Sequence, residues 1–114
     1  MTPPTTIFHN PRCTKSRQTL ALLQARGVGP DVVLYLDSPP DAATLRDLLT
    51  KLDLPASALV RKKEHRELGL DPTDDDDELV GRMAAHPRII ERPIVVRGDR
   101  AVLGRPPENV LKLL

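Results

Sequence analysis

Aromatic side chains are nearly absent from this sequence: tryptophan does not occur, and Phe8 and Tyr35 are the only other members of the class. Proteins that bind single-stranded nucleic acid stack bases on aromatic rings, so this composition excludes a stacking platform of that kind. An excess of one charge is also missing, since 17 Lys and Arg face 16 Asp and Glu and leave a formal net charge of +1. We therefore expect no nucleic-acid partner, and any affinity for anions must come from local clustering.

Long apolar runs are absent as well, and no apolar segment typical of a secretory signal follows Met1. We therefore expect a cytoplasmic protein that does not engage a membrane. Hydrophobic residues make up 39% and charged residues 29% of the 114 positions, which is typical of a globular chain. This length suits one domain, and we predict a single domain over residues 1–114 that acts as a monomer.

Cysteine occurs once, at Cys13. An intramolecular disulfide is therefore excluded, and a redox-active Cys13 would need a second sulfur from another molecule. A metal site is not expected either. The four aspartates of residues 74–77 lack the spacing of a calcium-binding loop, and helix N-termini attract acidic residues.

Strands and helices alternate along the chain. The first predicted elements are a strand at residues 5–8, a helix at 16–26 closed by Gly27, and a strand at 32–35. Three helices follow, which begin at Ser38–Pro39 with Ser38 as cap, at Pro55 and at Thr73. The chain then continues with a hairpin of residues 93–96 and 101–103 and a helix from Gly104 to Leu114. A strand, helix and strand at this spacing form a βαβ unit with parallel strands. We predict an α/β fold with a four-stranded mixed sheet flanked by helices and a helical insertion at about residues 38–87.

The turn at residues 9–17 joins the first strand to the first helix and places Cys13 at or beside a helix N-terminus. Free N–H groups and the helix dipole favour negative charge there, so the pKa of the thiol should be lowered, more so beside Arg12, Lys15 and Arg17. The same features attract an oxyanion. We predict that Cys13 is exposed and ionised at neutral pH; the alternative is a small core residue.

Polar neighbours of Cys13 admit two interpretations each. His9 could hold the thiolate or move a proton, or it could be a strand-end residue that only bonds backbone. The hydroxyls of Thr14 and Ser16 could bond the sulfur or an oxyanion, and either could instead cap the helix.

Residues 9–20 carry the pattern His-Asn-Pro-x-Cys-x-x-Ser-Arg-x-Thr-Leu, which resembles the active-site segment of the ArsC family of arsenate reductases that use glutathione and glutaredoxin. Further blocks that resemble the family follow in order at residues 35–40, 59–62, 67–70, 86–87, 91–96 and 104–106. Pro-Arg-Cys at residues 11–13 and Arg-Pro-Pro-Glu at 105–108 are similar to a shorter branch of the family.

The resemblance implies a thioredoxin-like or glutaredoxin-like fold in which the Cys13 thiolate attacks the substrate. It implies that the thiolate is stabilised by His9 and Ser16, and that Pro93 forms a cis peptide bond opposite the thiol. It also implies an oxyanion site of three arginines: Arg61, Arg92 and Arg105. Guanidinium groups suit this role because each can hold an oxyanion through two hydrogen bonds and offset its repulsion from a thiolate.

The implied activity is the reduction of arsenate to arsenite in arsenic detoxification. Glutathione would serve as co-substrate and glutaredoxin as partner, with no bound cofactor. Two other functions stay open. The first is a monothiol glutaredoxin-like oxidoreductase that acts on glutathione mixed disulfides. The second is a transcriptional regulator of the same fold that binds RNA polymerase, although that branch carries Cys-x-x-Cys where this chain has Ser16.

Overall fold

The computed structural model describes residues 4–114, and the chain divides into two compact units. The first unit comprises Met1–Ser38 and Arg92–Leu114, and the second comprises Pro39–Glu91. The second unit overlaps the helical insertion expected after the second strand. The single domain over residues 1–114 stays a prediction.

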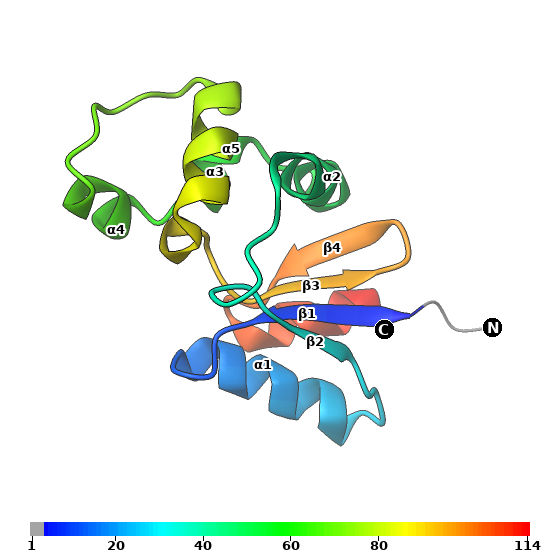
Figure 1. The fold of residues 1–114 in the computed structure, drawn as a ribbon. Helices are drawn as coiled ribbons and strands as arrows, with labels where there is room; N and C mark the ends of the chain where they lie inside the picture. The colour runs from blue at the N-terminus through cyan, green and yellow to red at the C-terminus, as the bar shows by residue number, and fades with distance from the viewer. Residues whose placement is uncertain (1–3) are drawn as a thin grey trace. The chain divides into compact units, whose positions relative to one another are not determined.

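The first unit contains a four-stranded mixed sheet (Figure 1). Its strands are β1 (Thr5–His9), β2 (Asp31–Leu34), β3 (Ile94–Arg97) and β4 (Arg100–Leu103), in the order β2-β1-β3-β4. The parallel pair β1 and β2 is connected through helix α1 (Thr14–Ala25), whereas β3 pairs antiparallel with both β1 and β4. The predicted βαβ unit, hairpin and mixed sheet are confirmed.

One face of this sheet carries the core of the unit. Ile7 and Val95 lie opposite each other on β1 and β3, and Leu23 of α1 packs with them. Val110 and Leu113 complete the cluster from the 3-10 helix η2 (Pro107–Leu113). Both α1 and η2 therefore cover the same face (Figure 1).

The last helix is a 3-10 helix, whereas the sequence predicted an undifferentiated helix from Gly104. Pro106 and Pro107 have no backbone N–H to donate at its start. The N–H of Asn109 closes onto the carbonyl of Pro106, three residues back, at 3.0 Å. This spacing is that of a 3-10 turn.

The second unit is helical. It contains α2 (Ala42–Leu52), α3 (Ala56–Leu59), α4 (Lys62–Glu67), α5 (Asp76–Ala85) and the 3-10 helix η1 (Pro87–Ile89). Its buried apolar side chains include Leu45, Leu48, Leu59, Leu79, Val80, Met83 and Ile89. Helix α4 was not expected, because its six residues are all polar or charged and form no apolar stripe.

The helix caps differ from the predicted ones by a few residues. Helix α2 is capped by Asp41, whose carboxylate accepts the N–H of Thr44 at 2.8 Å, and Ser38 is not its cap. Asp75 caps α5 in the same way, by accepting the N–H of Glu78 at 2.9 Å. The sequence predicted Ser38 as the cap of α2 and a helix that starts at Thr73, whereas α5 starts at Asp76. In both places an aspartate is the cap, since a carboxylate accepts these N–H groups at least as well as a hydroxyl.

No helix within residues 4–114 combines the length and apolar character needed to cross a membrane. The same described residues contain no cluster of three or more His, Cys, Asp and Glu side chains arranged to hold a metal ion.

Candidate active site

Cys13 is the N-cap residue of α1 and adopts an extended backbone with φ −94° and ψ 122°. Its own N–H donates to the carbonyl of Asn10 at 3.0 Å, which closes a turn, and its carbonyl accepts the N–H of Arg17 at 3.0 Å. No side chain caps α1. The N–H groups of the first helical turn are consequently free to face the Cys13 side chain.

The thiol of Cys13 is half-buried and its pKa lies below the ordinary value. Partial burial alone would raise this pKa, but hydrogen bonds outweigh it: the backbone N–H of Ser16 contributes most, followed by the Arg92 side chain through hydrogen bonding and charge, and by the backbone N–H of Lys15. These groups favour the thiolate over the thiol. The thiol is therefore less exposed than predicted, and the direction of the pKa change matches the prediction.

The nearby cations of the loop act differently from the sequence prediction. Arg17 donates to the carbonyl of Pro11 at 2.9 Å and to the hydroxyl of Thr14 at 3.2 Å, so it ties the loop to the helix. The Lys15 contribution comes from its backbone N–H. The side-chain charge that lowers the pKa of Cys13 comes from Arg92, which is far away in the sequence.

Arg92 and Arg105 lie together because the β3–β4 hairpin carries them. Ile94 pairs with Leu103, and beyond that pair the N–H of Gly104 donates to the carbonyl of Pro93 at 2.9 Å. Continuing this antiparallel register places Arg92 opposite Arg105. Arg105 Nη1 donates to the carbonyl of Arg92 at 3.2 Å and lies 4.0 Å from the Cys13 sulfur.

Both of these arginines precede a cis proline, since the Arg92–Pro93 and Arg105–Pro106 peptide bonds are cis in the structure. The first is the cis bond that the resemblance implied. The second was not anticipated.

Gly104 brings the end of the hairpin against α1. A Cβ at this position would lie 2.5 Å from Thr19 Oγ1 and 2.8 Å from Pro93 Cγ, so only glycine fits without displacement. The Thr19 hydroxyl, which is completely buried, also donates to the carbonyls of Lys15 at 2.8 Å and of Gly104 at 3.3 Å. Thr19 thus links the first turns of α1 to the segment that carries Arg105.

His9 and Ser16 form a buried pair beside the thiol. Alternating burial along β1 puts His9 on the same face as Ile7, toward α1. His9 Nδ1 and Ser16 Oγ share a hydrogen bond of 2.6 Å, and Ser16 Oγ also accepts the N–H of Asn10 at 3.0 Å. Ser16 therefore supports the thiolate with its backbone N–H, while its hydroxyl joins His9 to the loop.

Burial lowers the pKa of His9, and the positive charge of Arg17 lowers it further. Both effects favour the neutral imidazole over the imidazolium. The interpretation in which His9 only bonds backbone is wrong, because its imidazole bonds the side chain of Ser16, the residue whose N–H faces the sulfur. A role of His9 toward the thiolate or in moving a proton stays a prediction.

Arg61, the third predicted anion ligand, belongs to the second unit. Its Nε lies 3.2 Å from a carboxylate oxygen of Glu64, and its Nη1 lies 3.2 Å from one of Glu91. Its backbone N–H donates to the carbonyl of Ile89 at 2.6 Å. The role of Arg61 toward Cys13 stays a prediction.

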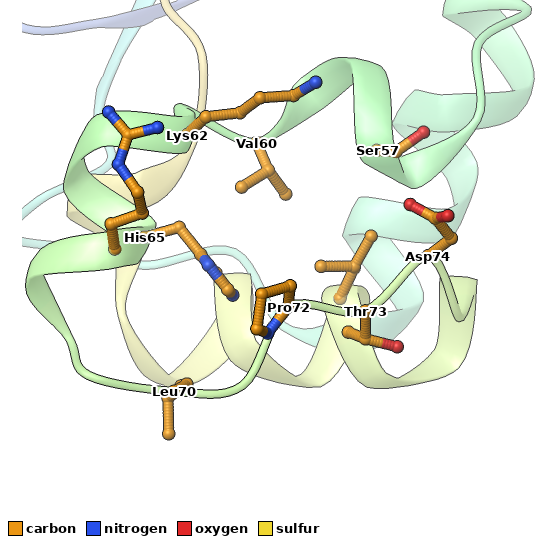
Figure 2. Close-up of a pocket in the computed structure, with 10 residues that line it drawn as sticks. Ser57, Val60, Lys62, His65, Leu70, Pro72, Thr73 and Asp74 are labelled. Carbon is orange, nitrogen blue, oxygen red and sulfur yellow. The ribbon is translucent and has the colours of Figure 1, made fainter.

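A pocket of about 540 Å³ lies within the second unit (Figure 2). Its lining combines apolar groups with charges of both signs, as Figure 2 shows for Val60, Pro72, Lys62 and Asp74. None of the predicted site residues lines this pocket.

Sequence reasoning did not find three residues that shape the site: Thr19, Gly104 and Asn109. Thr19 and Gly104 stood inside the matching segments at 9–20 and 104–106, yet nothing in the sequence showed that they touch each other across 85 positions. Asn109 carries no local signal beyond its place near the start of the final helix.

A single cysteine at the start of α1, two arginines from the β3–β4 hairpin and a mixed four-stranded sheet define a thioredoxin-like protein. The chain belongs to the ArsC family, whose family model matches residues 8–113.

Similar proteins agree with this assignment. The chain is 51% identical over 118 residues to protein YfgD of Escherichia coli (strain K12), covering 100% of this chain and 99% of that one. It is 49% identical over 112 residues to an arsenate reductase of Neisseria meningitidis serogroup B, covering 95% and 96%. The structure superposes on an arsenate reductase from Vibrio cholerae with a TM-score of 0.89 at 42% identity, with full coverage of both chains.

Proposed function

We propose that this protein is an arsenate reductase that uses glutathione and glutaredoxin, with the Cys13 thiolate as nucleophile. The observation that carries the proposal is the convergence of two helix N–H groups, Arg92 and Arg105 on one sulfur. Such a site stabilises a thiolate and attracts an oxyanion at the same point. Relatives described as arsenate reductases, at 49% and 42% identity, support the choice of arsenate.

The proposed reaction begins when the Cys13 thiolate attacks arsenic and one arsenate oxygen leaves as water after protonation. A sulfur–arsenic(V) bond results. The glutathione thiolate then attacks the Cys13 sulfur, a sulfur–sulfur bond forms, and the electron pair of the broken sulfur–arsenic bond stays on arsenic, which departs as arsenite. Glutaredoxin attacks the glutathione sulfur of the mixed disulfide and regenerates Cys13.

Each site residue has a stated role in this scheme. Arg92 and Arg105 bind the oxyanion and offset its repulsion from the thiolate, and Arg61 is proposed as the third ligand. Ser16 stabilises the thiolate through its N–H, and His9 holds Ser16. The scheme requires no resident cofactor or metal. It fits a cytoplasmic monomer that acts as one domain, and these three properties are proposed with it.

The direct test measures arsenite formed from arsenate in the presence of glutathione and glutaredoxin. We expect turnover by the wild type, none by Cys13→Ser, and kcat/KM reduced on the order of 10²-fold by Arg92→Ala, as for loss of one preorganised charged donor. Arg26→Ala, at an exposed position beyond the C-terminal end of α1, is the matched control and should retain activity.

The alternatives predict different outcomes in the same samples. Absence of arsenite together with cleavage of a glutathionylated peptide would identify a monothiol oxidoreductase. Absence of both activities with retention of RNA polymerase on the immobilised protein would identify a regulator. Either result would overturn the proposed function.

A further inference from the structure

Asn109 makes a two-point contact with the segment that carries Arg105. Its side-chain Nδ2 donates to the carbonyl of Leu103 at 3.2 Å and to the carbonyl of Arg105 at 3.0 Å. The side chain is half-buried at the start of η2. The two carbonyls flank Gly104, so one amide group spans the turn by which the chain leaves β4.

Only a nitrogen with two hydrogens satisfies both carbonyls at this point. A carboxylate or an amide oxygen would face two other acceptors and repel them. The contact is therefore specific for the amide group and its orientation, which a packing role alone would not demand.

The contact of Asn109 matters because the guanidinium of Arg105 only just reaches the Cys13 sulfur. Arg105 Nη1 lies 4.0 Å from the Cys13 sulfur, at the outer limit of a hydrogen bond to sulfur, and donates to the Arg92 carbonyl at 3.2 Å. A small displacement of the Arg105 backbone would remove the guanidinium from the sulfur. Gly104 limits such movement on the α1 side, and Asn109 limits it on the η2 side.

We propose that Asn109 is a positioning residue for oxyanion binding, which acts by holding the backbone of Arg105 so that its guanidinium stays beside Cys13. This inference rests on the proposed function, because it takes Arg105 as a ligand of the oxyanion. Asn109 itself does not touch the Cys13 sulfur or the substrate; its effect passes through Arg105.

The test measures how well arsenate protects Cys13 from alkylation by iodoacetamide. We expect Asn109→Asp and Asn109→Ala to raise the arsenate concentration for half-protection about tenfold, equivalent to ~1.4 kcal/mol of binding. The alkylation rate without arsenate and its pH midpoint should not change, because the pKa of Cys13 is lowered by Arg92 and helix N–H groups. The control is Glu108→Gln, at the exposed position next to Asn109. This variant should need the same arsenate concentration for half-protection as the wild type.

A double-mutant cycle separates positioning from general stability. If Asn109 acts through Arg105, Arg105→Ala and the double variant Asn109→Ala/Arg105→Ala should need the same arsenate concentration for half-protection. Additive losses would overturn the positioning role, and so would normal protection of folded Asn109→Asp and Asn109→Ala proteins. Failure of arsenate to protect the wild type would instead contradict the proposed function, and the inference would fall with it.

Discussion

At the scale of single residues, groups of two kinds lower the pKa of the Cys13 thiol. The N–H groups of Ser16 and Lys15 belong to the helix that Cys13 begins, and Arg92 arrives from the hairpin. The first kind follows from sequence, since a strand followed directly by a helix exposes N–H groups at the junction. The second kind was implied only by the family resemblance, because the charges of Arg12 and Arg17 are nearer along the chain.

Replacing Arg92 by alanine should raise the pKa of Cys13, since both a hydrogen bond and a positive charge are lost. The rate of alkylation by iodoacetamide as a function of pH reports this pKa, because only the thiolate reacts. The midpoint for Arg92→Ala should lie above that of the wild type. Arg12→Ala, beside Cys13 in sequence, should leave the midpoint unchanged, and the reverse ranking of the two variants would refute this assignment of the charge.

His9 should make stability depend on pH just below neutrality. Its folded pKa is lowered by burial and by Arg17, whereas the unfolded chain keeps a value of about 6.5. As the pH falls below that value, His9 binds a proton in the unfolded chain more readily than in the folded protein. The free energy of unfolding therefore decreases. Asp41, whose pKa is lowered by the N–H and the hydroxyl of Thr44, titrates at more acidic pH and does not interfere.

Urea unfolding at pH 7.5 and 5.5 measures this effect. The wild type and the control His86→Asn, altered at an exposed position, should lose stability between these values, and His9→Asn should lose less. Equal losses in all three proteins would show that the buried His9–Ser16 pair does not control this window.

At the scale of secondary-structure elements, the site depends on close contact between α1 and the end of β4. Helix α1 and the hairpin of β3 and β4 were both predicted from the sequence pattern. Their contact was not predicted, because Thr19 and Gly104 meet only in the folded chain and neither has a distinctive local pattern. The exact caps also escaped prediction, since several Ser, Thr and Asp residues near each helix start could accept the same N–H groups.

Gly104→Ala should destabilise the protein by about 1–3 kcal/mol, because a methyl group would overlap Thr19 Oγ1 and Pro93 Cγ. Gly81→Ala is the matched control: it lies within α5 with open space around its Cβ direction, so it should be neutral or stabilise by up to about 1 kcal/mol. Urea denaturation provides both values. A Gly104→Ala protein as stable as the wild type would mean that this packing is looser than the structure indicates.

At the scale of the whole molecule, the alternation of strands and helices, apart from α4, and the mixed sheet followed from the sequence. The residues of the candidate site fall into both of the compact units. Cys13, Arg92 and Arg105 come together within one unit, so their association follows from the sheet register. Arg61 lies in the other unit and pairs there with Glu64 and Glu91. These ion pairs are ordinary for an arginine and do not indicate an oxyanion ligand. The assignment of Arg61 as a ligand therefore rests on family resemblance alone.

In the proposed mechanism, reaction with arsenate makes the Cys13 sulfur accept a glutathione. Intact-protein mass spectrometry tests it after incubation with arsenate and reduced glutathione, without glutaredoxin. One glutathione per chain should appear on Cys13 only when arsenate is present, with one arsenite released for each, and later addition of glutaredoxin should remove it. An unmodified Cys13 in the presence of both reactants, or the same modification without arsenate, would contradict the proposed mechanism.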